Sequence, residues 1–195
     1  AVSYAIARQE THREVCEDLI KRKLEDGEDI DFYMVSVQTF CKTLDNHYLC
    51  AEFAISKIGP GHATEHESHV IHPGKIPIGC SADCRESEER HRITSDLSQL
   101  SQIEGVRTYS QMWIHLRTIL GRRMRKGNRP SFKTANDIIK NAENVIFTLE
   151  ANVEIVTDLL NQFAEAAGET CWFAVCSAEI LAQTMYRNLY NRGRS

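Results

Sequence analysis

A basic segment, GRRMRKGNRP at residues 121–130, concentrates five cationic side chains within ten positions. The chain as a whole has a formal net charge of −4, so any site for a polyanion must be local. Guanidinium and ammonium groups at this density suit a path of nucleic-acid phosphates. A solvated loop or a nuclear-localisation patch would have the same composition, and the sequence leaves these alternatives open. The five residues are Arg122, Arg123, Arg125, Lys126 and Arg129.

Histidines gather in a second segment, HATEHESHVIH, at residues 62–72. His62 and His66 have the i, i+4 spacing that would bind a metal from one face of a helix. The preceding GPG disfavours a helix there, so we expect a solvated loop. The four histidines are His62, His66, His69 and His72.

Seven cysteines are scattered along the chain rather than framed for disulfides. Cys80 and Cys84, with His91 nearby, could form a zinc site, but this spacing is a weak signature. We expect residues 81–92 to be an excursion on the surface. The first fifteen residues carry charges early and no long apolar run, so we expect no signal peptide and reduced thiols in the cytosol or nucleus. No apolar run is long enough for a membrane helix, and we expect no membrane partner.

Hydrophobic periodicity predicts one α/β domain with mixed strand directions, 29–195, preceded by a charged N-terminal helix within 1–28. Residues 31–41 and 48–58 are strand-like and are joined by a turn-rich segment, which indicates an antiparallel hairpin. Residues 131–147 fit a strand and a helix in either order. The other predicted elements are a strand at 69–73 and helices at 10–25, 109–120, 152–168 and 171–190.

The helix at 109–120 has one apolar face. Tyr109 and Trp113 on this helix could stack on bases, but their helical spacing favours core packing. Gly168 is expected to end the helix at 152–168. The apolar face comprises Met112, Trp113, Leu116, Ile119 and Leu120.

Four segments, VSVQT, CAEFAIS, HVIHPGKIP and HRITSDL, follow one another along the chain. In type and order they resemble elements of the DEDD-type 3′→5′ exonucleases, which have an RNase H-like fold with a mixed sheet flanked by helices. That family's first strand ends Asp-x-Glu-Thr, and here Ser36 and Gln38 stand at the two acidic positions. Two-metal phosphodiester cleavage needs several carboxylates to hold the ions. The resemblance therefore implies the fold without the two-metal chemistry.

The segments YLCAEFAISKI, EHESHVIHPGKIP and KGNRP are similar to those of one branch of this superfamily, the Maelstrom domain of the germline piRNA pathway. In that family a Glu-Cys-His-Cys set holds zinc. The resemblance maps its glutamate to Glu52 and its last cysteine to Cys176, and it leaves Cys171 as the candidate for the first cysteine. The histidine has no counterpart, so zinc is a candidate cofactor with an incomplete ligand set. Burial as small apolar residues of the last helix is the simpler interpretation of both cysteines, and we expect Glu52 near the start of that helix.

The resemblance implies a role in piRNA-guided transposon silencing, with single-stranded RNA and silencing-pathway proteins as partners. It also implies perinuclear cytoplasmic granules and the nucleus as locations, and a weak, metal-independent endoribonuclease activity whose catalytic residues the sequence does not identify. Two alternatives remain: a functioning DEDD-type exonuclease, and a catalytically inactive scaffold that binds only proteins. The missing acids weigh against the first alternative, and the basic segment weighs against the second.

Overall fold

The structure is a computed structural model that describes residues 2–25, 32–59, 65–120, 145–171 and 173–194. β-Branched and aromatic residues dominate the two longest strands, as pleated, half-buried surfaces favour. The strands are β1 (Phe32–Lys42), β2 (Tyr48–Ile58), β3 (Glu65–His72), β4 (Arg107–Thr108), β5 (Val145–Thr148) and β6 (Ala174–Ser177). The helices are α1 (Val2–Glu25), α2 (Ser81–His91), α3 (Leu97–Leu100), α4 (Tyr109–Leu120), the 3-10 turn η3 (Glu150–Asn152), α6 (Val153–Ala166) and α7 (Ala178–Arg192).

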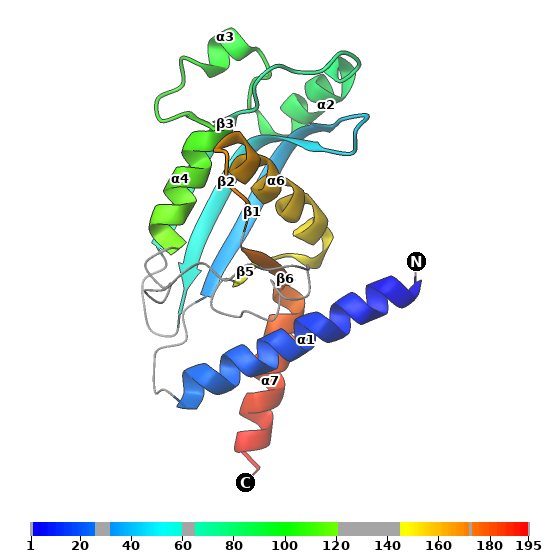
Figure 1. The fold of residues 1–195 in the computed structure, drawn as a ribbon, viewed down its shortest axis with the longest axis vertical. Helices are drawn as coiled ribbons and strands as arrows, with labels where there is room; N and C mark the ends of the chain where they lie inside the picture. The colour runs from blue at the N-terminus through cyan, green and yellow to red at the C-terminus, as the bar shows by residue number, and fades with distance from the viewer. Residues whose placement is uncertain (1, 26–31, 60–64, 121–144, 172, 195) are drawn as a thin grey trace.

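The strands form a six-stranded sheet in the order β4-β3-β2-β1-β5-β6. β1 to β3 are antiparallel neighbours, whereas β5 pairs parallel with β1 and β6 pairs parallel with β5. Figure 1 shows α4 and α6 beside the long strands, and α1 crossing α7 near the short ones. This mixed sheet flanked by helices is compatible with an RNase H-like fold, which confirms the predicted α/β class.

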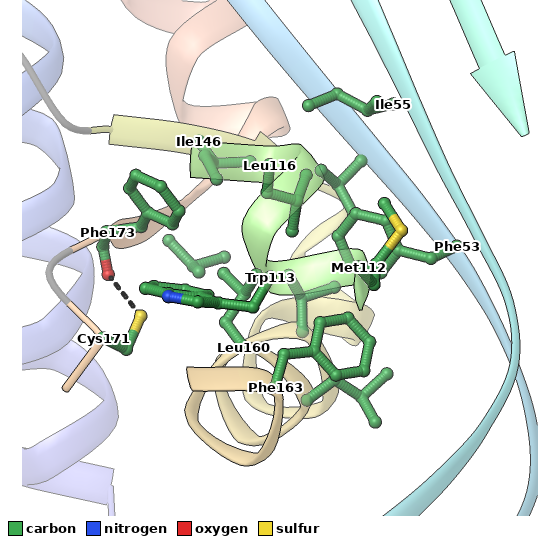
Figure 2. Packing of buried hydrophobic residues seen from close by; sticks show 14 of the residues in the cluster. Phe53, Ile55, Met112, Trp113, Leu116, Ile146, Leu160, Phe163, Cys171 and Phe173 are labelled. Atoms are coloured by element: carbon green, nitrogen blue, oxygen red, sulfur yellow. Dashed lines mark hydrogen bonds between the residues drawn. The ribbon is translucent and has the colours of Figure 1, made fainter. Parts of the chain in front are cut away.

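The main core lies between the sheet and helices α4 and α6, and Figure 2 shows how its side chains interlock. Trp113 is fully buried and packs against Phe173, with ring centroids 5.1 Å apart. Trp113 therefore belongs to the core, as predicted, and cannot stack on a base. Gly168 ends the last turn after α6 with a φ of 71°, which confirms the predicted stop.

A second core joins α1 and α7 to the short strands. Phe32 and Phe147 meet edge to face there, with ring centroids 5.5 Å apart. Val15 and Ile20 of α1 are buried in the same cluster, so the N-terminal helix packs directly on the domain. None of the described helices combines the length and the apolar content that a membrane span requires.

Three local predictions were wrong. Residues 81–91 form α2, which lies on β1 and buries Cys84 and Ser87, because small side chains three positions apart make a narrow apolar contact under a charged outer face. The strand β3 begins at Glu65, so His66 is on a strand rather than in a loop. Cys176 belongs to β6 rather than to the last helix, because the run AVCS pairs with β5 before α7 begins.

Candidate functional site

The predicted catalytic strand is β1, in the middle of the sheet. Ser36 and Gln38 are two residues apart and so lie on one face of it, and Gln38 is paired with Glu52 of β2. We refer to Ser36, Gln38 and Glu52 as the β1 tip. A hydroxyl, an amide and one carboxylate do not supply the set of carboxylates that a two-metal site needs.

Glu52 is half-buried and close enough to His91 for their charges to interact. Both ring nitrogens of His91 are engaged: Nε2 donates to the carbonyl oxygen of Thr39 at 3.2 Å, and Nδ1 accepts from the amide of Ile93 at 3.1 Å. Burial lowers the pKa of His91, which favours this neutral ring. His91 therefore has no ring nitrogen left for a zinc site with Cys80 and Cys84.

The structure does not bring together Glu52, Cys171 and Cys176. Cys171 is buried under α4 and α6, whereas Cys176 is buried in the core under α1 and α7. Glu52 lies on β2, three strand spacings from β6, which is roughly 14 Å across the sheet. Burial raises the pKa of the Cys171 thiol to about 11 and that of Cys176 further still, so both favour the neutral form. The two cysteines occupy the places of small core residues.

The structure does bring together three residues that the sequence did not connect. Glu67 and His69 lie on the same face of β3, and His115 projects from α4. The Glu67 Oε2 atom is 2.6 Å from Nε2 of His115 and 3.2 Å from Nε2 of His69. The two imidazole rings meet edge to face with centroids 4.9 Å apart. A carboxylate thus joins two histidines near the edge of the sheet.

Arg107 of β4 completes this group, which we call the β3–α4 site: Glu67, His69, Arg107 and His115. Its Nε donates to Nδ1 of His69 at 3.2 Å, so the proton of the neutral His69 ring is on Nε2. Burial, helped by the charge of Arg107, lowers the pKa of His69. The hydrogen bond from His115 lowers the pKa of Glu67, which therefore stays ionised between the rings.

Two imidazoles and a carboxylate could in principle hold a divalent transition metal, since their ligand atoms lie within 4.8 Å of one another. A metal-bound histidine normally donates its other ring N–H to an acceptor. In His69 that second nitrogen faces the N–H of Arg107, which is a donor. The arrangement of hydrogen bonds therefore suits proton transfer better than metal binding.

An open pocket of about 420 Å³ adjoins the β3–α4 site along α4. Arg107 and His115 both line it, together with the amide of Gln111 and the hydroxyl of Thr118. A guanidinium and an imidazole at the wall of one open pocket can bind an anion such as a phosphate group.

Sequence reasoning placed His69 in a histidine-rich segment but assigned it no partner. The alternation of Glu67 and His69 was a signal for a strand face extending upstream of the predicted strand. His115 stands outside the predicted apolar face of α4 and was the only histidine of that helix. The pairing of β3 with β4, which brings in Arg107, had no signal in the sequence.

Two exposed tyrosines form a separate feature on α7. Tyr186 and Tyr190 are one helical turn apart, with nearly parallel rings whose centroids are 6.2 Å apart. They are 69% and 47% exposed. The guanidinium of Arg194 lies over the ring of Tyr190 at 4.5 Å. The five residues of the basic segment lie outside the part of the chain that the structure describes.

Comparison with known proteins identifies the family. Residues 41–193 match the family model described as Maelstrom, a piRNA pathway germ-plasm component. No match is found among curated proteins. The family match spans β2 to α7 and so includes the β3–α4 site and most of the sheet. The chain belongs to the Maelstrom family of piRNA-pathway germ-plasm components.

Proposed function

We propose that this domain binds single-stranded RNA during piRNA-guided transposon silencing. The observation that carries the proposal is the exposed Tyr186–Tyr190 pair, with Arg194 over one ring. Unpaired bases stack on aromatic rings and on guanidinium planes, whereas bases in a duplex have both faces covered. Exposed tyrosines beside a cation are therefore suited to single strands.

The basic segment supports the same function. Arg122, Arg123, Arg125, Lys126 and Arg129 follow α4 directly in the sequence, and we propose that they contact RNA phosphates. Membership of the Maelstrom family places the domain in the piRNA pathway. We propose silencing-pathway proteins as its other partners, and cytoplasmic granules and the nucleus as its locations.

The test is a binding titration of the protein with single-stranded RNA, duplex RNA and single-stranded DNA, each with and without EDTA. We expect the tightest binding to single-stranded RNA, unaffected by EDTA. Added Mg²⁺ or Mn²⁺ should produce no ladder of 3′-shortened products, because the β1 tip lacks the paired acids. Such a ladder would restore the exonuclease alternative.

A double substitution, Tyr186→Ala with Tyr190→Ala, tests the aromatic pair. We expect an affinity about 10-fold lower or more, since each stacked base contributes about 1–3 kcal/mol. Ile78→Ala is the control, because Ile78 is a large apolar residue that is 95% exposed and remote in sequence from α7. An unchanged RNA affinity in the double variant would assign the tyrosines to protein docking, as the scaffold alternative requires.

A further inference from the structure

We infer that the β3–α4 site cleaves the backbone of single-stranded RNA without a metal, using the RNA 2′-hydroxyl as the nucleophile and His115 as the general base. The inference rests on the proposed binding of RNA. It assigns named residues to a reaction for which the β1 tip offers no adequate set of groups.

His115 has the geometry of a general base held by a carboxylate. Its Nε2 is 2.6 Å from Oε2 of Glu67, so this nitrogen carries the proton of the neutral ring. The lone pair is then on Nδ1, and the ring lines the open pocket. A carboxylate that fixes the tautomer and stabilises the imidazolium is the arrangement by which an acid–histidine pair takes up a proton.

Arg107 supplies positive charge at the same pocket. Its Nε is engaged by His69, and its side chain lines the pocket beside His115. A guanidinium stabilises the extra negative charge that a phosphate gains during attack. His69 separates Arg107 from Glu67, which prevents the two charges from neutralising each other directly. Glu67 and His69 are therefore positioning residues, whereas His115 and Arg107 are placed to touch the substrate.

The reaction needs no co-reactant other than water. Nδ1 of His115 accepts the proton of the 2′-hydroxyl, and the 2′-oxygen forms a bond to the adjacent phosphorus. The bond from phosphorus to the 5′-oxygen breaks, and the leaving oxygen takes a proton from water. The hydroxide that forms takes the proton from His115. The products are a 2′,3′-cyclic phosphate and a 5′-hydroxyl end.

This step explains why single strands would be the substrate. The 2′-oxygen must come into line with the leaving 5′-oxygen, and A-form helical geometry holds it away from that position. A flexible strand reaches it without melting a helix. The pocket is open to solvent along α4, which leaves room for a chain that continues in both directions.

The test uses two oligonucleotides of one sequence, unmodified RNA and fully 2′-O-methylated RNA, in EDTA. The methylated strand measures binding alone, because it has no 2′-hydroxyl to react. We expect the wild-type protein to bind both strands and to cleave only the unmodified one, with cyclic-phosphate ends. His115→Asn should lower the cleavage rate about 100-fold or more without changing the affinity for the methylated strand.

The other variants separate positioning from binding. Glu67→Gln should lower kcat with KM unchanged, and Arg107→Gln should weaken both the affinity and the rate. His66→Asn, an exposed histidine on the same strand whose ring contacts Ser56, is the matched control and should keep wild-type cleavage. Thermal unfolding of each variant checks that it is folded.

Four results would overturn the inference. They are a wild-type rate in His115→Asn, products with 3′-hydroxyl ends, binding of both strands without cleavage, and cleavage that EDTA abolishes and Zn²⁺ restores. The last result would make the cluster a metal site. Failure of the wild-type protein to bind either strand would instead refute the proposed function, and the inference with it.

Discussion

At the β1 tip, in the middle of the sheet, Gln38 is paired with Glu52, which carries the single carboxylate, and Ser36 lies two residues away on β1. At the β3–α4 site, two strands towards the edge, one carboxylate joins two imidazoles, and a guanidinium contacts one of them. Both regions are built on the same sheet, but only the second combines imidazole side chains with an adjoining open pocket. The comparison teaches that the place where a fold usually carries its catalytic groups need not be where a given chain carries them.

The largest expected effect is a difference in stability between substitutions at two residues of α4, Trp113 and His115. Trp113→Ala should lower the free energy of unfolding by about 3–5 kcal/mol, because Trp113 is fully buried against Phe173 and the cavity could not close. His115→Asn, at a half-buried position that contacts Glu67 and His69 of β3, should change it by less than about 1 kcal/mol. Urea unfolding of both variants measures this. Similar decreases for the two would mean that His115 is structural, and would weaken its assignment to chemistry.

The next effect concerns the basic segment, which follows α4 in the sequence. Changing Arg122, Arg123, Arg125 and Lys126 to Ala should flatten the salt dependence of RNA binding. The log–log slope should change by about 0.7 for each RNA phosphate that the variant no longer neutralises. Measurements of affinity at several salt concentrations give this slope. If slope and affinity were both unchanged, the segment would be a solvated or localisation element.

The smallest expected effect concerns His69 and His47, whose pKa values are shifted in opposite directions. Burial lowers the pKa of His69 below 6.5, so its contribution to stability is present above that pH and is lost as the pH falls towards its folded value. The hydrogen bond to Asp158 raises the pKa of His47, so its contribution is present below pH 6.5 and is lost as the pH rises through its folded value.

Lowering the pH should therefore raise the Tm of His69→Asn relative to that of the wild type. It should lower the Tm of His47→Asn relative to that of the wild type. We expect changes of about 1–2 °C in Tm between about pH 7.5 and about pH 5.5. Thermal unfolding at the two values gives both differences. Shifts of the same sign in the two variants would show that His69 is not held neutral by its surroundings.

Much of the architecture could be predicted from the sequence, because local residue patterns encode its main elements. The hairpin of β1 and β2 was encoded by strand residues on either side of a turn, and the apolar face of α4 by its helical period. The helix α2 was missed because Cys84 and Ser87 give almost no apolar signal to mark its buried face. β6 was missed because a four-residue strand merges with the apolar start of α7.

The candidate site was less accessible, because its parts come from separate elements. Glu67 and His69 share a strand, but His115 lies on a helix more than forty residues further along, as the 48-residue separation from Glu67 shows. Only the pairing of β3 with β4 and the packing of α4 on β3 bring them together, and no local pattern reports such contacts. The proposed zinc ligands, in contrast, had a signal in the sequence. They followed from a resemblance in sequence, and the order of the strands keeps Glu52 and Cys176 apart.

The most direct test of the account is a map of where single-stranded RNA contacts the isotope-labelled protein in solution. Uncleavable 2′-O-methyl RNA would be titrated while the NMR signals of histidine and tyrosine side chains and backbone amides are followed. We expect the signals of His115, His69 and Tyr186 to shift together, with Ser36 and Gln38 unchanged. Shifts confined to Ser36, Gln38 and Glu52 would contradict the account, because RNA would then occupy the β1 tip and leave the β3–α4 site empty.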